Sequence, residues 1–194
     1  MTDGAPRFLS SRLLPGVFEA IGEVPRLTVL DAGSALPESV DFFSQSRCRL
    51  CFADIFEEVA GEAEEMRDEG VWLALFNRVF DYPADTRFDL CLFWDVFNYL
   101  DDIALRALAT ALRPFLHDKT MAHGFAVLNR RTRVPSAQYG VLARDQISVR
   151  PRPLPAVARF PRSQANLESV FPIFNARRSV LHGDGLLEVS LGVS

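Results

Sequence analysis

Continuous apolar runs and amphipathic stretches alternate along this chain, and their order predicts an α/β fold. The apolar runs have the composition of strands buried on both faces of a parallel sheet. The amphipathic stretches between them have the spacing of helices that cover such a sheet. The predicted strands are 27–31, 49–54, 88–93 and 121–128, and the predicted helices between them are 37–44, 71–79 and 103–115. We therefore expect a Rossmann-like three-layer sandwich with a mostly parallel central sheet.

The two ends of the chain have different patterns. Residues 1–26 carry apolar side chains at roughly helical spacing, which predicts a helical segment packed on the sheet. Ser163 opens a capped helix that Pro172 stops. After it, Asp184-Gly185 lies between apolar runs, a strong signal for a β-hairpin. The sheet is therefore expected to end in a carboxyl-terminal antiparallel hairpin.

Composition narrows the class of protein. A chain of 194 residues with 48% hydrophobic and 24% charged residues is expected to form a single globular domain, 1–194. No apolar run reaches the length of a membrane span, and the amino terminus lacks the pattern of a secretory signal, so we expect a cytoplasmic protein. The net charge of −4 argues against general nucleic-acid binding. Composition does not indicate an oligomeric state.

The segment 129–162 is basic within this acidic chain. It is rich in arginine and proline and reads as an insertion after the predicted strand 121–128, with one or two short strands near 141–150. Arginine binds carboxylate and phosphate groups in a bidentate manner, so the segment could take an anionic ligand, an acidic protein partner or RNA. The alternative is that these arginines pair with the Glu-rich stretch 56–68 of the same chain.

Two cysteine and histidine patterns have structural explanations. Cys48 and Cys51 form a C-x-x-C pattern, but in a strand such positions point to opposite faces, which disfavours a metal or redox site. His123 lies within an apolar strand and is expected to be a hydrogen-bonded core residue rather than a catalyst. We therefore expect no metal.

Polar residues follow three of the predicted strands. Asp31 and Gly33 end the first, Asp54 ends the second, and Asp95 lies just beyond the strand 88–93. Since ligands of open α/β sheets bind beyond the carboxyl ends of the strands, these residues should share one site. A carboxylate about 20 residues after the first turn is well placed to bind ribose hydroxyls, although Asp54 could equally cap the next helix.

These residues resemble a known family, the class I S-adenosylmethionine-dependent methyltransferases. Asp31-x-Gly33 matches the start of the family's acidic-x-Gly-x-Gly-x-Gly loop, and Phe88-Asp-Leu-Cys-Leu-Phe-Trp-Asp-Val-Phe-Asn-Tyr-Leu100 resembles its fourth strand and following loop. The resemblance implies S-adenosylmethionine as cofactor and assigns roles to particular residues. The implied cofactor-binding residues are Asp31, Gly33, Ser34, Asp54, Trp94 and Asp95, the implied catalytic residues are Asp95 and Tyr99, and the implied substrate-binding residues are Asn98 and Tyr99.

The chain departs from that family in four places. Ala35 and Pro37 replace the later glycines of the loop, and Tyr99 stands where many members have histidine. The interval 55–87 shows no clear strand, so the sheet is expected to lack the family's third strand. Two functions follow: a methyltransferase-like protein with an unknown small-molecule or protein acceptor, or an inactive relative. The inactive relative would keep the fold as a binding or regulatory module, and would use its Arg-rich segment for an anionic ligand or protein partner.

Overall fold

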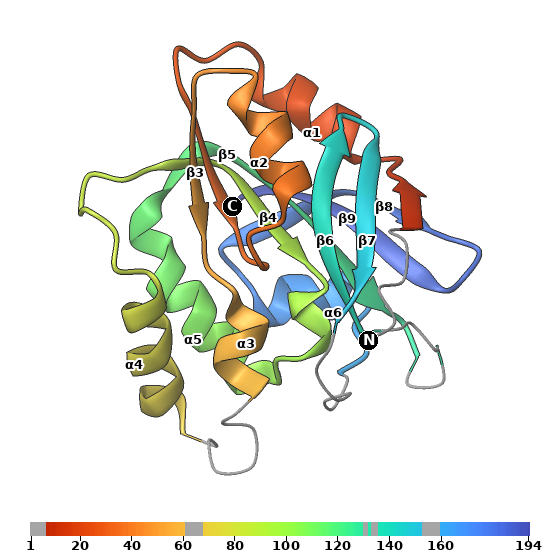
Figure 1. Ribbon diagram of the computed structural model, residues 1–194. Helices are drawn as coiled ribbons and strands as arrows, with labels where there is room; N and C mark the ends of the chain where they lie inside the picture. Colours follow the sequence, from red (N-terminus) through yellow and green to blue (C-terminus); the bar gives the residue numbers. More distant parts are fainter. Residues whose placement is uncertain (1–6, 61–67, 130–131, 133–135, 153–159) are drawn as a thin grey trace.

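The computed structural model describes residues 7–60, 68–129, 132, 136–152 and 160–194 (Figure 1). Helices and strands alternate in the order expected of an α/β protein. The strands are β1 (Arg7–Ser10), β2 (Leu27–Asp31), β3 (Cys48–Phe52), β4 (Phe88–Trp94), β5 (Leu116–Val127), β6 (Ala137–Ala143), β7 (Gln146–Pro151), β8 (Phe174–Leu181) and β9 (Leu186–Val193). The helices are α1 (Leu14–Ile21), α2 (Pro37–Ser44), α3 (Ile55–Ala60), α4 (Glu69–Val79), α5 (Asp102–Leu112) and α6 (Gln164–Val170), with 3-10 turns η1 (Val96–Asn98) and η2 (Arg113–Phe115).

The central sheet within these ranges has six strands in the order β3-β2-β4-β5-β9-β8. The first four are parallel, and β9 pairs antiparallel with both β5 and β8. This confirms the mostly parallel sheet and its carboxyl-terminal hairpin. In the described part of the chain β3 forms the edge of the sheet, in agreement with the expected loss of the third strand.

A second, three-stranded antiparallel sheet has the order β1-β7-β6. Its hairpin β6–β7 comes from the segment 129–162, and its third strand comes from the amino terminus. Figure 1 shows β6 and β7 beside α2, and β6 contacts that helix. The insertion predicted from the sequence therefore folds back over the helix that follows the Asp31 loop.

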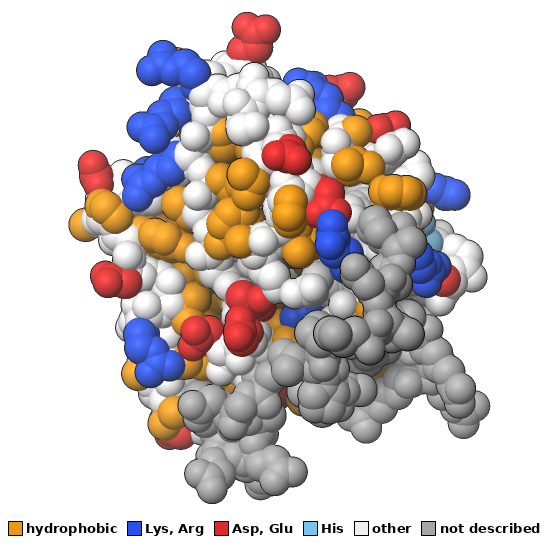
Figure 2. Space-filling model, in the orientation of Figure 1, with side chains coloured by type: hydrophobic (Ala, Val, Ile, Leu, Met, Phe, Trp, Pro, Cys, Tyr) orange, Lys and Arg blue, Asp and Glu red, His pale blue; other side chains and the backbone are white. Residues whose placement is uncertain are grey.

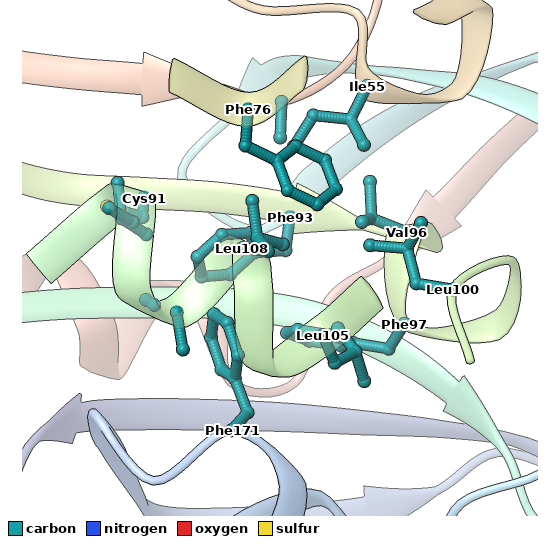
Figure 3. Close-up of a cluster of buried hydrophobic side chains, with 14 of the residues drawn as sticks. Ile55, Phe76, Cys91, Phe93, Val96, Phe97, Leu100, Leu105, Leu108 and Phe171 are labelled. Carbon is teal, nitrogen blue, oxygen red and sulfur yellow. The ribbon is translucent and has the colours of Figure 1, made fainter. Parts of the chain in front are cut away.

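Side chains from alternate positions of the central strands supply two cores. On one face, β4 contributes Cys91 and Phe93 to a cluster with α3, α4, α5 and α6, part of which is drawn in Figure 3. On the other face, β4 contributes Leu90 and Leu92 to a cluster with α1, α2 and the small sheet. Helices and the second sheet thus cover both faces of the central sheet, as the uninterrupted apolar strands predict.

Two sequence-based predictions need correction. Residues 7–10 are a strand rather than part of a helical segment, because β1 pairs with β7. A pairing between segments so far apart in the sequence cannot be predicted from a local pattern. The residues between the predicted helix 103–115 and the predicted strand 121–128 are not a connecting loop, because β5 begins at Leu116. Leu116 pairs with Phe88 and Met121 pairs with Leu90, so a register shift absorbs the intervening polar residues.

The C-x-x-C cysteines behave as the strand periodicity predicts. Cys51 belongs to the core on the α4 face, whereas Cys48 packs against the core on the α1 face. Both are free thiols, and burial raises the pKa of Cys48 to about 11. Among the described residues no group of three His, Cys, Asp or Glu side chains could hold a metal ion. None of the helices in the described ranges is long and apolar enough to cross a membrane.

Candidate functional site

Three carboxylates lie where the parallel strands β2, β3 and β4 end. Asp31 is the last residue of β2, Asp54 follows β3 and Asp95 follows β4. The strands are neighbours, and Asp31 pairs with Phe52 on one side and Leu92 on the other. Asp31 and Asp95 are buried and Asp54 is half-buried. The structure therefore brings together the acidic residues that the sequence placed at strand ends.

The carboxylate of Asp31 is satisfied by its own chain. Its Oδ1 accepts hydrogen bonds from Trp94 Nε1 at 2.5 Å and from the Gly33 amide at 3.0 Å. Its Oδ2 accepts one from Ser39 Oγ at 3.3 Å. Burial raises the pKa of Asp31 to about 7, against the opposing effect of these bonds. The buried carboxyl group therefore keeps its proton to a higher pH than an exposed aspartate does.

Trp94 covers the loop that follows β2. It has a φ of 51°, which makes it the one non-glycine residue of the described chain with a left-handed backbone. Its ring stacks on Tyr139 of β6, with centroids 5.7 Å apart and planes at 12°. A Cβ added to Gly33 would lie 2.9 Å from Trp94 Cδ1. In this structure the absence of a side chain at Gly33 makes room for the indole.

Arg152, which follows β7, inserts its guanidinium between the other two carboxylates. Nη2 lies 3.3 Å from Asp95 Oδ1, and Nη1 lies 4.0 Å from Asp54 Oδ1. The guanidinium carbon sits 3.6 Å from the centre of the Phe56 ring, a close cation–π contact. Two further bonds run to the Ala137 carbonyl, at 3.1 and 2.6 Å. Only 6% of the side chain is exposed, so the site holds a desolvated positive charge.

Asp54 and Ser34 form the outer part of the site. Ser34 Oγ donates a short hydrogen bond to Asp54 Oδ2 and accepts one from Gln138 Nε2 at 2.8 Å. Asp54 Oδ1 also accepts the Glu57 amide at 3.1 Å, at the start of α3. The structure therefore shows the helix-capping role of Asp54. Its role in binding ribose stays a prediction.

The residues expected to face an acceptor fall into two groups. Tyr99 donates from its hydroxyl to Asp95 Oδ2 at 2.8 Å. Burial and the nearby charge of Asp95 raise the pKa of Tyr99 above its ordinary value, so the phenol is not a base near neutral pH. Asn98 accepts the Val127 amide at 2.8 Å and donates to the Phe125 carbonyl at 3.2 Å. Its amide thus fastens η1 to β5, and its substrate-binding role stays a prediction.

Other arginines of the segment 129–162 also bond within the chain. Arg150 pairs with Glu38 of α2 at 2.7 Å. Arg162, 2% exposed, pairs with Asp102 and donates to the carbonyls of Phe97 and Leu100. These arginines pair within the chain, but with Glu38 and Asp102 rather than with the Glu-rich stretch 56–68, so the predicted pairing with that stretch is not observed for them. Arg130, Arg131, Arg133 and Arg159 lie outside the described residues.

Figure 2 shows how charged and hydrophobic side chains are distributed on one face of the molecule. Several basic side chains lie together at its upper left edge, acidic side chains are scattered over other parts, and hydrophobic side chains gather in its middle, around α2. Val40 of α2 and Leu142 of β6 are exposed hydrophobic residues.

Sequence reasoning missed three residues of the site: Gln138, Tyr139 and Arg152. Gln138 and Tyr139 belong to β6, and Arg152 follows β7, far along the chain from the Asp31 loop. The available signal was the Arg/Pro-rich composition of 129–162, which marks the insertion but does not say which arginine points inward.

The structure has the fold of the class I S-adenosylmethionine-dependent methyltransferases, as its similarity to solved structures shows. A methyltransferase from Burkholderia thailandensis, solved with 1,6-didemethyltoxoflavin and S-adenosylhomocysteine, matches with a TM-score of 0.52 and 14% identity over 94% of this chain and 77% of its own. The PH0226 protein from Pyrococcus horikoshii matches at 0.51 and 13%, over 94% and 88%. A TehB-like methyltransferase from Corynebacterium glutamicum matches at 0.50 and 11%, over 93% and 87%. No family model and no curated protein matches the sequence.

The site has the groups that a cationic cofactor needs. Carboxylates suit an ammonium group, ribose hydroxyls and a positively charged sulfur, and the structure places a desolvated guanidinium between two of them. The guanidinium acts as a stand-in for a positively charged ligand. The chemistry of the donor set therefore fits S-adenosylmethionine, on the condition that Arg152 leaves the carboxylates.

Proposed function

We propose that this protein is an S-adenosylmethionine-binding, methyltransferase-like protein whose cofactor site is closed by its own Arg152. The observation that carries the proposal is the guanidinium held between Asp54 and Asp95 with 6% of its side chain exposed. Desolvating a charge is costly unless it is paired, so this site is built to hold a positive group. The named structural neighbours support the same cofactor class, because one carries S-adenosylhomocysteine.

Each carboxylate would have a distinct task when the cofactor is bound. Asp31 would hold the amino group, Asp54 the ribose hydroxyls, and Asp95 with Tyr99 would face the methyl acceptor. The cofactor supplies an electrophilic methyl group on a positively charged sulfur. Methyl transfer by alignment alone needs no general base, which suits a site whose tyrosine has a raised pKa.

Arg152 sets the affinity in this proposal. A site that is open in only a fraction of molecules binds with an affinity reduced by that fraction. Arg152→Met keeps apolar contact with Phe56 but removes the positive charge. We expect this variant to bind S-adenosylmethionine about tenfold more tightly than the natural protein, measured by isothermal titration calorimetry. Arg150→Met is the matched control, because Arg150 pairs with Glu38 instead, and it should leave the affinity unchanged.

The second candidate is an inactive binding module of the same fold. It is favoured by Trp94, whose indole already bonds to Asp31 and packs over Gly33, and by Pro37, which begins α2 where the family has a loop glycine. If neither the natural protein nor Arg152→Met binds S-adenosylmethionine or S-adenosylhomocysteine at millimolar concentration, while both stay folded by circular dichroism, the cofactor proposal is wrong. The inactive module then stands.

A further inference from the structure

A concave site lies at the opposite end of the strands from Asp31 and Asp95. It is an open pocket of about 730 Å³. Its lining comes from α1, from the first part of β5, and from β8 and β9. This volume is within the range of small-molecule sites, roughly 300 to 1,000 Å³. Met121 pairs with Leu90 near the start of β4 and with Gly192 of β9, whereas Asp95 follows the end of β4. The pocket is therefore separate from the candidate cofactor site.

Basic side chains dominate the charge of this pocket. Four of its lining residues are basic and two are acidic, an excess of two positive charges in a chain whose net charge is −4. Asp118 is already close to His117, at 3.9 Å. Within the described ranges none of the four basic side chains makes a hydrogen bond or ion pair that would neutralise it. The basic residues are Arg12, Lys119, Arg177 and Arg178, and the acidic residues are Glu19 and Asp118.

One of these arginines, Arg177, packs over Gly192 of β9. A Cβ added to Gly192 would lie 2.5 Å from Arg177 Nε and 3.2 Å from its Cζ. The guanidinium of Arg177 therefore lies directly over the β9 backbone, in space that any other residue would fill. Arg178 follows it at a register shift of β8, between Ala176 and Arg178. The two arginines thus come from an irregular part of an edge strand.

The helix end beside the pocket is not the group that attracts an anion. At the amino end of α1, the Leu14 amide donates to Ser11 Oγ, and the Arg12 and Leu13 amides donate to the buried carboxylate of Glu188. These amides are already bound within the chain. Attraction for an anion must come from the basic side chains, while Leu13, Val17 and Met121 provide an apolar wall.

We propose that the pocket binds a small phosphomonoester that joins a phosphate group to an apolar body. A phosphomonoester carries a charge near −2 at neutral pH, which matches the local excess of two positive charges. Guanidinium groups bind phosphate oxygens in a bidentate manner. A single carboxylate would leave part of the positive charge unmatched. The apolar wall accounts for the body of the ligand, and the concave shape favours a small molecule.

The test uses phenyl phosphate and inorganic phosphate as probes for the full chain, by titration calorimetry at low salt. We expect phenyl phosphate to bind with a dissociation constant on the order of 0.1 to 1 mM, and inorganic phosphate more weakly. Arg177→Gln combined with Arg178→Gln should weaken phenyl phosphate at least about tenfold, because two charged hydrogen-bond donors are lost. These side chains are exposed, so the double variant should fold.

Three further variants locate the effect. Arg106→Gln changes an exposed arginine of α5 and should leave binding unchanged. Gly192→Ala forces Arg177 off the strand without changing the charge, and should weaken phenyl phosphate several-fold. Benzoate should bind more weakly than phenyl phosphate. Arg152→Met should have no effect here, which separates this proposal from the cofactor proposal.

Three results would overturn the inference. One is the absence of phenyl phosphate binding to the natural protein. Another is equal affinity of the natural protein and the Arg177/Arg178 double variant. The third is tighter binding of an RNA oligonucleotide or of anionic lipid vesicles that still depends on these arginines, which would identify the pocket as part of a macromolecular surface.

Discussion

Arg152 Nη2 lies 3.3 Å from Asp95 Oδ1, and both side chains are almost fully withdrawn from water. Asp95 also accepts the hydroxyl of Tyr99 at 2.8 Å. An arginine from the insertion thus closes the end of the sheet where the fold usually takes its ligand. The energetic consequence is that neither member of the pair can be removed without leaving a buried charge.

Breaking this pair should destabilise the protein. Arg152→Ala leaves Asp95 buried without its cation, and we expect a loss of about 2 to 4 kcal/mol in the free energy of unfolding. Asp95→Asn in the same chain should restore part of the loss, since the neutral amide needs no counter-charge. Urea denaturation of the two single variants and the double variant measures the coupling. A coupling energy near zero would show that the pair is not formed.

Gly124 is expected to tolerate no side chain. A Cβ there would lie 2.8 Å from Phe97 Cε2 and 3.0 Å from the Trp94 carbonyl oxygen. Gly124→Ala should therefore cost about 1 to 3 kcal/mol through overpacking. Gly16→Ala is the matched control, because nothing lies within 4 Å of a Cβ added in α1. The control should raise stability by up to about 1 kcal/mol through helix propensity.

Thermal unfolding checks both glycine variants under one condition. The expected result is a lower midpoint for Gly124→Ala and an unchanged or higher midpoint for Gly16→Ala. Equal midpoints would contradict the close packing of η1 against β5.

Asp31 should make the stability depend on pH. Burial raises its pKa from 3.8 to about 7 in the folded protein, so between these values the folded state keeps a proton that the unfolded state has lost. Stability contributed by this group is thus fully present below pH 4 and is lost as the pH rises to 7. The loss amounts to about 4 kcal/mol at most, since each pKa unit corresponds to about 1.4 kcal/mol.

Asp31→Asn isolates that effect because the amide does not titrate and still offers an oxygen to Trp94. We expect the stability of the natural protein to fall relative to this variant as the pH rises from 4 to 7. Urea denaturation at four or five pH values gives both curves. Parallel curves would mean that Asp31 is already ionised at low pH in the folded state.

Glu188 fastens the amino-terminal segment to β9. Its buried carboxylate accepts hydrogen bonds from Ser11 Oγ, from His123 Nε2 at 2.8 Å and from His182 Nε2 at 2.8 Å. Burial opposes ionisation, but the hydrogen bonds and charge of His123, with the bond from Ser11, outweigh it and hold the pKa of Glu188 well below its usual range. Glu188→Gln should cost about 2 to 4 kcal/mol at pH 7.

The exposed Glu23 supplies the control for this prediction. Glu23→Gln should change stability by less than about 0.5 kcal/mol. Hydrogen exchange gives a second measurement, since the amides of α1 should exchange faster in Glu188→Gln than in the natural protein. Unchanged exchange in α1 would contradict the fastening role.

Much of the fold could be predicted because its signals are local. The apolar runs at 27–31 and 88–93 determined which segments are buried strands, and Pro37 and Ser163 marked the starts of helices. Strand periodicity also predicted correctly that Cys48 and Cys51 point to opposite faces. Because parallel strands end at one edge, the sequence also placed Asp31, Asp54 and Asp95 near one another.

Only the tertiary structure decided what these carboxylates contact. Gln138 and Ser34 lie 104 residues apart in the sequence, and their hydrogen bond exists because β6 packs beside α2. The arginine that pairs with Asp95 is the one whose side chain turns inward. The arginine content of the basic segment does not show which side chain that is. The pairing of β1 with β7 likewise depends on the free edge of β7, which exists only once the β6–β7 hairpin has formed. Local patterns specify elements, whereas contacts between distant elements depend on how those elements pack.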